Sequence, residues 1–338
     1  MPSAQPILVL DSGLGGLTVV RALQSALPAE DIVYFGDTAR LPYGNKSAAN
    51  VATFVRQIIA YVLPLDPKHV VIACNTATAL ALPAVRAAFP GLPVSGVVDP
   101  GAKAAVVAAG SAKRPVIGIL ATEATVRSRA YERAILRRRS HARLLLRSAP
   151  LLVPIVEEGR ADDDPLVDLA LRQYLEPLVR HGPAVLVLGC THYPILKPAV
   201  VRVVGPDVRV IDSAEQCAQD VAHRLRAAGL LRPGAGVKAV AYAPYAGLRG
   251  DARSVRTSPP ATSGAPGALT APGTPVGSRA ADGRGALRCF VTDDAPRFAA
   301  LASQFLGDRI DPPTWVPPEQ LYALPPAPQG AASLRVPA

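Results

Sequence analysis

The sequence has 338 residues, of which 49% are hydrophobic and 18% are charged, and its net charge is +10 at pH 7. This hydrophobic fraction is large enough for a buried core, which excludes a wholly disordered chain, and the length corresponds to two domains or to one domain with additional segments. Four cysteines do not make a disulfide scaffold, and no apolar stretch reaches the 18 residues of a membrane span.

Residues 1–13 lack the positively charged stretch and the long apolar run of a signal peptide. We therefore expect a cytoplasmic protein with reduced thiols and no membrane contact. The positive charge by itself is compatible with a nucleic-acid partner. Its densest cluster consists of Arg133, Arg137, Arg138, Arg139, Arg143 and Arg147. Because no aromatic residues alternate with these arginines, we interpret the cluster as a solvated helix end and loop, and we do not expect nucleic-acid binding.

Apolar runs of strand length alternate with segments of helical length over the first 230 residues. This alternation predicts mostly parallel sheets that are covered by helices on both faces. Strands are expected at residues 7–10, 32–35, 70–73, 94–97, 116–120, 185–188 and 208–211. Helices are expected at residues 18–27, 47–62, 76–89 and 165–180. A further helix is expected to begin at Ser213, which forms a capping-box pattern with Gln216.

The order of these parts occurs twice. A strand followed by a polar loop, at residues 7–13 and again at 116–122, precedes a strand that ends in a cysteine, at Cys74 and again at Cys190. This repeat predicts an α/β fold with two similar, doubly wound domains that face each other. The first domain is expected to comprise residues 1–98 and 212–310, and the second domain residues 99–211.

The composition changes after about residue 242. Of the 43 residues from Pro244 to Ala286, 31 are Gly, Ala, Pro, Ser or Thr, so we expect a disordered insertion at residues 244–286. Residues 287–291 predict a strand, and Asp293 or Asp294 is expected to cap a helix that runs to about Leu306. The Pro-rich C-terminal tail, residues 311–338, predicts irregular structure on which only Trp315 offers a packing surface.

Polar residues that directly follow strands are candidates for a site, because ligands bind at the carboxyl ends of parallel strands. The segment Asp11–Gly16 follows the first strand. Its glycines permit close approach of the backbone, and the helix after them offers free N–H groups to an anion. The segment has neither the dinucleotide-binding spacing nor a Walker lysine. It predicts a carboxylate or phosphate site, with a tight structural turn as the alternative.

Cys74 and Cys190 follow strands at points where helices begin. A helix N-terminus stabilises a thiolate and lowers the thiol pKa from about 8.5 toward neutrality. Inert burial and a zinc site are the alternatives, but the Cys-x-His spacing is not typical of zinc. Two opposed thiols suit general acid–base chemistry on both faces of one carbon, with Asp11 assisting Cys74 and His192 assisting Cys190.

The other cysteines and histidines have no such pattern. Cys217 and Cys289 lie within an expected helix and strand, without the polar motif that accompanies Cys74 and Cys190, so we predict that they pack in the core. Surface or loop positions are expected for His69, His141, His181 and His223.

Four motifs resemble, in their order, those of the glutamate racemases: Asp11–Leu17, Pro42–Gly44, Cys74–Ala77 and Gly189–Pro194. The resemblance extends from about Ile7 to Asp212 and resumes at residues 290–306. It implies two α/β domains with the active site in the cleft between them, racemisation of glutamate without a cofactor, and a supply of D-glutamate for peptidoglycan. Such chemistry needs a water-poor cleft, which predicts domain closure with hinges near residues 98–100 and 211–213.

The resemblance also implies roles for single residues. Cys74 corresponds to the base on the D-glutamate face and Cys190 to the base on the L-glutamate face, and Glu157 corresponds to the acidic residue near His192. The positions that correspond to those holding the α-carboxylate and ammonium groups are Ser12, Asn75, Thr76 and Thr191. Asp11 corresponds to the partner of Cys74, and Thr122 and Thr125 resemble the family's paired threonines in the second domain, so these three are also implied substrate-binding residues. The loop near the side-chain carboxylate corresponds to Pro42, Tyr43 and Gly44, followed by Asn45 where the family usually has a smaller polar residue.

Other functions stay open at this point. No lysine is placed to form a pyridoxal Schiff base, so we expect no cofactor and no metal. The alternatives are a related racemase acting on aspartate or a hydantoin, a basic DNA-binding or regulatory protein with a racemase-like fold, and a single-thiol hydrolase at Cys74. Thr191 and His192 favour glutamate, and the presence of both cysteines argues against the last two. The partner is then a small-molecule substrate, while the sequence decides neither a homodimer nor an activating cell-wall precursor.

Overall fold

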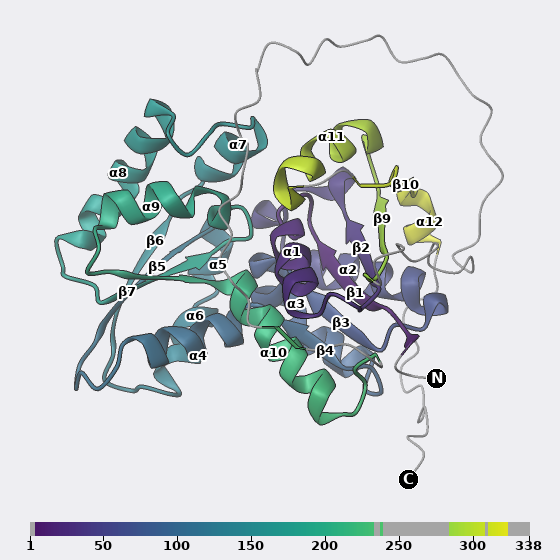
Figure 1. Cartoon of the computed structure of the whole chain (residues 1–338), viewed down its shortest axis with the longest axis horizontal. Coiled ribbons are helices and arrows are strands. Elements are labelled where there is room, and N and C mark those ends of the chain that lie inside the picture. Colours follow the sequence, from purple (N-terminus) through teal and green to yellow (C-terminus); the bar gives the residue numbers. More distant parts are fainter. Residues whose placement is uncertain (1–3, 233–236, 239–283, 308–309, 324–338) are drawn as a thin grey trace.

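The computed structural model describes residues 4–232, 237–238, 284–307 and 310–323, and these residues form two parallel β-sheets flanked by helices (Figure 1). The first sheet has the strand order β10-β9-β2-β1-β3-β4, and the second has the order β6-β5-β7-β8. Neighbouring strands in both sheets are parallel. The predicted α/β class and the two-domain arrangement are confirmed.

The strands of the first sheet are β1 (Ile7–Asp11), β2 (Ile32–Gly36), β3 (His69–Ile72), β4 (Val94–Gly96), β9 (Leu287–Val291) and β10 (Thr314–Trp315). Those of the second sheet are β5 (Val116–Ala121), β6 (Arg143–Ser148), β7 (Val185–Gly189) and β8 (Arg209–Asp212). The central strands β1, β2, β3 and β7 are buried along their whole length. Burial on both faces explains why these strands are uninterrupted apolar runs in the sequence.

The helices of the first domain are α1 (Leu17–Ala26), α2 (Ala48–Val62), α3 (Asn75–Ala88), α11 (Ala295–Leu306) and α12 (Pro318–Tyr322). The second domain contains α5 (Glu123–Arg127), α6 (Ala130–Leu136), α7 (Leu152–Glu157), α8 (Pro165–Val179) and α9 (Lys197–Val204). Two helices, α4 (Val98–Ala108) and α10 (Ser213–Ala227), lead from one sheet to the other and pack on each other. Short 3₁₀ turns are η2 (Thr38–Arg40), η3 (Tyr43–Asn45), η4 (Leu63–Leu65) and η5 (Tyr193–Leu196).

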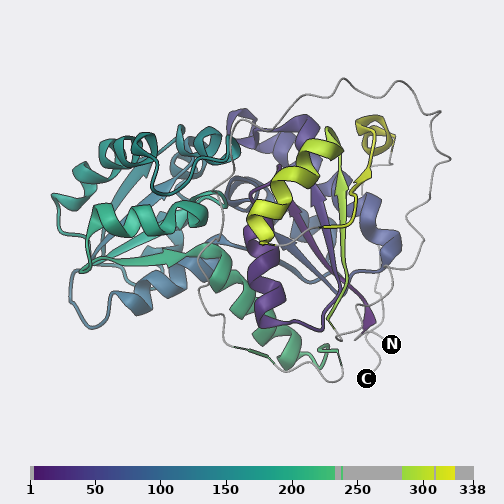
Figure 2. The ribbon, with the colours of Figure 1, turned by 45° about the horizontal axis from the view of Figure 1, so that its top comes forward.

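Helices α1, α10 and α11 cover the same face of the first sheet, as Figure 2 shows. The cap of α10 differs from the prediction by one residue. Asp212 is the N-cap and accepts a hydrogen bond from the Ala214 N–H (2.8 Å), whereas the Ser213 hydroxyl donates to the Leu188 carbonyl (3.0 Å). The prediction for α11 is confirmed at Asp294, which accepts from the Arg297 N–H (3.1 Å).

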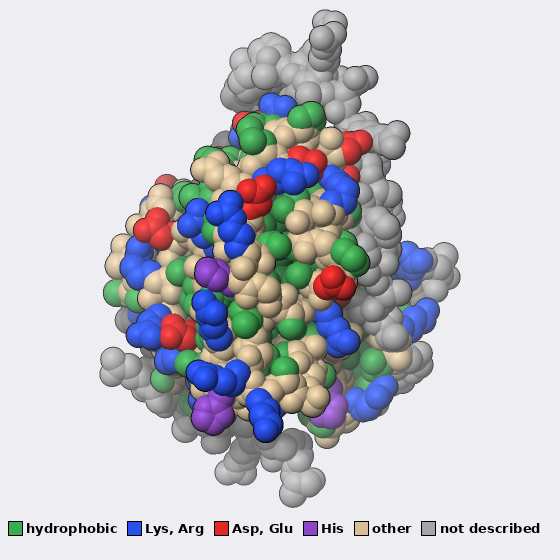
Figure 3. All heavy atoms as spheres, turned by 90° about the vertical axis from the view of Figure 1, so that its left-hand side faces the viewer, with side chains coloured by type: hydrophobic (Ala, Val, Ile, Leu, Met, Phe, Trp, Pro, Cys, Tyr) green, Lys and Arg blue, Asp and Glu red, His purple; other side chains and the backbone are tan. Residues whose placement is uncertain are grey.

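The predicted arginine cluster is only partly a helix end and loop. Arg143 and Arg147 lie in β6, an edge strand that the sequence pattern missed because these arginines flank an apolar run of only three leucines. Arg133 lies in α6, and Arg137 follows this helix. Figure 3 shows the face at the left of Figure 1, where basic side chains are spread among acidic, polar and apolar ones rather than gathered into one patch.

The segment Ala48–Leu65 is long and apolar enough, by length and composition alone, to cross a membrane. It comprises α2 and η4, and one face of α2 packs in the hydrophobic core of the first domain. The core residues of this face are Val51, Ala52, Val55, Ile58, Ile59 and Val62. This helix therefore contributes one face to the core of the first domain.

The C-terminal segment corrects the prediction of irregular structure from residue 311 onward. β10 pairs with β9, and α12 follows it. Val316 and Leu321 are fully buried in the core of the first domain, whereas Trp315 is 58% exposed. Val316 and Leu321 could not be identified as core residues from the sequence, because the segment around them is rich in proline. The predicted insertion lies outside the described residues except for 284–286, where the Ala286 N–H donates to Asp31 Oδ1 (2.9 Å).

Candidate active site

The two predicted cysteines line one cavity between the domains, with a volume of about 410 Å³. It lies at the carboxyl ends of β1, β3, β5 and β7, where the sequence analysis placed it. The first domain contributes Ser12, Gly13, Leu41, Pro42, Tyr43, Gly44, Asn45, Cys74, Asn75 and Thr76. The second domain contributes Thr122, Glu123, Pro150, Val153, Pro154, Glu157, Cys190, Thr191 and His192. Of the predicted site residues, Asp11 and Thr125 do not line the cavity but lie behind residues that do.

Cys74 is the N-cap of α3. Its sulfur accepts a hydrogen bond from the Ala77 N–H (3.4 Å) and lies 3.6 Å from the Ser12 hydroxyl oxygen. Burial and the negative charge of Asp11 nevertheless raise the pKa of the Cys74 thiol to about 12, against the smaller effect of these two hydrogen bonds. The predicted lowering of this pKa by the helix N-terminus is therefore wrong, because desolvation outweighs it.

Cys190 lies beside a histidine that is held by a carboxylate. The Cys190 sulfur is 3.9 Å from Nδ1 of His192, and Nε2 of the same ring is 3.0 Å from Oε1 of Glu157. Burial alone lowers the pKa of His192, but the hydrogen bonds to Cys190 and Glu157 outweigh it and raise the pKa to about 10. At neutral pH the ring is therefore an imidazolium, with a positive charge close to the sulfur.

Three threonine hydroxyls meet across the domain boundary. Oγ1 of Thr76, on α3, lies 3.0 Å from Oγ1 of Thr122 and 3.3 Å from Oγ1 of Thr125. The Thr122 hydroxyl donates to Thr125 (2.9 Å), and Thr122 is also the N-cap of α5. This cluster brings several hydroxyl donors and acceptors to the edge of the cavity, where they can bind a carboxylate.

Near the cysteines, two buried polar side chains each have one hydrogen-bonded atom and one atom without a hydrogen-bond partner among the described residues. Asp11 Oδ2 accepts from the Gly13 N–H (3.0 Å), whereas Oδ1 has no partner among the described residues. Asn75 Oδ1 accepts from the Tyr131 hydroxyl (2.8 Å), whereas Nδ2 has no partner within the same part of the chain. Tyr131 was not predicted, because nothing in its sequence surroundings indicates that it supports Asn75 from the other domain.

The glycine-rich turn after β1 packs against the loop that bears Cys190. The N–H groups of Leu17, Thr18 and Val19 donate to carbonyls within the turn, so they are not free to bind an anion. A Cβ atom at Gly15 would lie 2.3 Å from Oγ1 of Thr191 and 2.5 Å from Nδ1 of His192. The absence of a side chain therefore lets the loop after β7 approach the loop after β1, while Ser12 and Gly13 of the same segment line the cavity.

Thr18 is a second residue that the sequence analysis missed. Its hydroxyl lies 3.0 Å from the main-chain carbonyl oxygen of Thr191 and 2.9 Å from that of Gly15, and it donates toward both. This contact holds the main chain between Cys190 and His192 against the first domain. The position appears in the sequence only as one residue of an amphipathic helix, so the contact could not be predicted.

The remaining cysteines and histidines mostly follow expectation. Cys217 and Cys289 are buried packing residues, and burial raises the pKa of each thiol to about 12. His141, His181 and His223 are exposed. His69 corrects the prediction, because it lies in β3 with Nε2 2.9 Å from the Ser95 hydroxyl. Burial lowers the pKa of His69 to about 4, so the ring is neutral.

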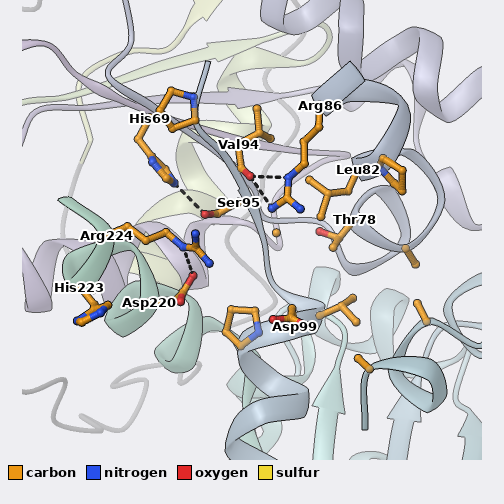
Figure 4. A pocket seen from close by; sticks show the side chains of 18 of the residues that line it. His69, Thr78, Leu82, Arg86, Val94, Ser95, Asp99, Asp220, His223 and Arg224 are labelled. Carbon is orange, nitrogen blue, oxygen red and sulfur yellow. Dashed lines mark hydrogen bonds and ion pairs between the residues drawn. The ribbon is translucent and has the colours of Figure 1, made fainter. Parts of the chain in front are cut away.

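A second cavity of about 1130 Å³ lies between α3, β4, α6 and α10 (Figure 4). None of its lining residues is a cysteine or a predicted site residue. Its arginines already have partners: Arg86 donates to the Val94 carbonyl, Arg224 pairs with Asp220, Arg133 donates to the Ser128 carbonyl, and Arg137 pairs with Asp99. This larger cavity is therefore not the candidate catalytic site. Within the described residues, no group of His, Cys, Asp and Glu side chains is arranged to hold a metal ion.

Comparison with known proteins places this geometry in context. Residues 7–221 match the Asp/Glu/Hydantoin racemase family. The glutamate racemase of Geobacter metallireducens is 44% identical over 225 residues, which cover 67% of this chain and 82% of that relative.

Solved structures agree with the sequence match. The crystal structure of glutamate racemase isoform RacE1 from Bacillus anthracis has a TM-score of 0.74 at 30% identity, and the match covers 93% of this chain and 98% of that chain. Escherichia coli glutamate racemase, in complex with L-glutamate and the activator UDP-MurNAc-Ala, has a TM-score of 0.56 at 30% identity, with 68% and 85% of the two chains covered.

Proposed function

The chain belongs to the Asp/Glu/Hydantoin racemase family, and from this premise we propose that it interconverts L- and D-glutamate by moving the α-proton between two cysteine thiols, without a cofactor. One observation carries the proposal. Cys74 and Cys190 come from corresponding strand ends of different domains and line the same cavity. A carbon atom bound between them faces one sulfur on each side, which is what inversion by two bases requires.

Cys190 is the proposed base for L-glutamate. The imidazolium of His192, held by Glu157, provides a positive charge 3.9 Å from this sulfur, and a nearby cation stabilises a sulfur anion. The thiolate takes the α-proton, and the electron pair of the broken C–H bond stays on the α-carbon and its carboxylate. Cys190 is then a thiol.

Cys74 is the proposed acid in the same direction. Because its pKa is raised to about 12, the sulfur carries a proton at neutral pH. That proton passes to the opposite face of the α-carbon, which gives D-glutamate and leaves Cys74 as a thiolate. In the reverse direction the roles exchange. Asp11, with one unpartnered carboxylate oxygen, is proposed to attract the substrate's α-ammonium group, whose positive charge then offsets the negative charge that opposes a Cys74 thiolate.

The polar donors around the cysteines are proposed to bind the carboxylates. Ser12, Asn75, Thr76, Thr122 and Thr191 line the cavity close to the sulfurs and suit the α-carboxylate. The loop of Pro42, Tyr43 and Gly44 suits the side-chain carboxylate. Each proton transfer contributes about 10²–10⁴-fold. The rest of the acceleration comes from stabilising negative charge in a cleft that closes, with α4 and α10 as the connections that bend.

The biological role follows from the product. D-glutamate is proposed to serve peptidoglycan synthesis in the cytoplasm. We also propose that a cell-wall precursor activates the enzyme. The structure of Escherichia coli glutamate racemase with L-glutamate and the activator UDP-MurNAc-Ala supports this proposal.

The direct test is racemisation in the absence of any added cofactor, followed by circular dichroism. The circular dichroism signal of L-glutamate should decay, and that of D-glutamate should decay to the same final ratio of the two enantiomers. L-aspartate should react far more slowly. Activity on aspartate alone would overturn glutamate as the substrate. Both EDTA-treated and untreated enzyme should give the same rate.

A further inference from the structure

Residues 41–45 form one wall of the cavity, but the support of this wall lies outside the cavity. The Tyr43 side chain is buried, and its hydroxyl donates a hydrogen bond to Oδ2 of Asp37. The ring also packs on Phe54 of α2, with 5.7 Å between the ring centroids. The loop is therefore held at Tyr43, which is one of the residues that line the cavity.

Asp37 is the centre of this support. Its carboxylate is fully buried at the end of β2 and accepts Arg40 Nε–H at 3.0 and 2.7 Å from its two oxygens. The Arg40 side chain is fixed in turn, because Nη1 donates to Gln57 (2.6 Å) and the guanidinium lies 4.3 Å from the Phe54 ring centroid. A buried carboxylate with this many donors has one orientation.

The last partner of Asp37 comes from a distant part of the chain. Thr292, which follows β9, donates its hydroxyl to Asp37 Oδ1 (3.1 Å) and accepts the Ala39 N–H (2.9 Å). Thr292 is buried, and neither it nor Asp37 or Arg40 lines the cavity. Thr292, at the end of β9, therefore completes the hydrogen-bond network around Asp37 from outside the cavity.

We propose that Asp37 is a positioning residue that fixes the 41–45 loop against the side-chain carboxylate of the substrate, and that Thr292 fixes Asp37. The inference rests on the proposed function, which places that carboxylate at this loop. If the loop is held at a constant distance from the cysteines, the site selects substrates by the length of their side chain. Aspartate is shorter by one methylene, a difference that a rigid site converts into about 10–200-fold discrimination.

The test uses Thr292→Val, which keeps the side-chain shape but removes both hydrogen bonds. We expect the KM for L-glutamate to rise about 3–10-fold with kcat within about twofold, because a binding contact is weakened while the cysteines are untouched. The ratio of kcat/KM for glutamate to that for aspartate should fall by about the same factor. Thr292→Ser, which restores the hydroxyl, should return both quantities to the wild-type values.

Two further variants make the outcome decisive. Tyr43→Phe leaves the Arg40–Asp37 ion pair intact and should raise KM in the same way, so it carries the test if Thr292→Val does not fold. Tyr61→Phe, a half-buried tyrosine that packs on Phe35 and Phe290, is the matched control and should not change KM. Unchanged KM in both test variants, or a fall in kcat alone, overturns the inference while the proposed function stands. A wild-type enzyme that is inactive on glutamate overturns the proposed function, and the inference with it.

Discussion

The two halves of the site are alike in position and opposite in charge. Cys74 and Cys190 both follow a central parallel strand, yet Cys74 is next to the carboxylate of Asp11, whereas Cys190 is next to the imidazolium of His192. The internal repeat therefore preserved the location of the sulfur but not its surroundings. The resting enzyme is asymmetric as a consequence, with a proton on one sulfur and a cation beside the other, which is the arrangement that the proposed reaction of L-glutamate requires.

The largest test of this comparison replaces either sulfur. Cys74→Ser and Cys190→Ser should each lower racemisation by about 10²–10⁴-fold, because a hydroxyl is a much poorer base at neutral pH. In D₂O, Cys190→Ser should still exchange the α-proton of D-glutamate but not that of L-glutamate, and Cys74→Ser should show the reverse. Circular dichroism and NMR measure the two effects. Full activity in either variant would contradict the two-base scheme.

A smaller loss of activity should follow when the loop after β7 is moved away from the loop after β1. Gly15→Ala places a Cβ atom 2.3 Å from Thr191 Oγ1 and 2.5 Å from His192 Nδ1, so the loop that bears Cys190 must move. We expect kcat/KM to fall roughly 100-fold, the cost of a displacement of about 1 Å at reacting groups. Gly91→Ala is the matched control, because its Cβ would meet nothing within 4 Å. Equal activity of the two variants would show that the contact at Gly15 is unimportant.

The smallest expected effect removes the charge asymmetry while both sulfurs remain. In Glu157→Gln the pKa of His192 should fall from about 10, so the alkaline limb of the kcat/KM profile should move to lower pH, with a loss of roughly 10-fold at pH 8. In the wild type, the imidazolium is present up to about pH 10 and is lost above it. The stability that it contributes is complete below about pH 6.5 and disappears as the pH rises through about 10.

The control for this variant is the adjacent Glu158→Gln. Glu158 is mostly exposed, and among the described residues its carboxylate pairs with Arg160. The kcat/KM profile of the Glu158→Gln variant should match that of the wild type between pH 7 and 11. If Glu157→Gln also leaves the alkaline limb in place, the raised pKa of His192 does not depend on this carboxylate.

Much of the fold and of the site could be predicted from the sequence, because both depend on local patterns. Buried parallel strands appear as apolar runs, and the residues after them mark the cavity, which is why Cys74, Cys190 and the polar residues beside them were found. β6 was missed because its apolar run is only three leucines long and has an arginine on each side, which an edge strand tolerates.

The rest depends on contacts between distant parts of the chain. Thr18, Tyr131 and Thr292 have no local signature, since each acts through one hydrogen bond to a residue of another element. The pKa of Cys74 was predicted in the wrong direction for the same reason. Helix position is visible in the sequence, whereas the extent of burial and the approach of Asp11 are properties of the assembled fold.

The strand order of the first sheet also determines when the domain can be completed during synthesis. β2 pairs with β9, and 255 residues separate Ile32 from its partner Leu287. At about 5–20 residues per second, the ribosome needs on the order of tens of seconds to supply that strand. The second sheet, contiguous from residue 116 to residue 212, is available earlier. During that interval β2 can pair only with β1, and its other edge, which β9 covers in the complete fold, has no partner strand, so a nascent chain that stalls before residue 287 exposes an edge prone to aggregation.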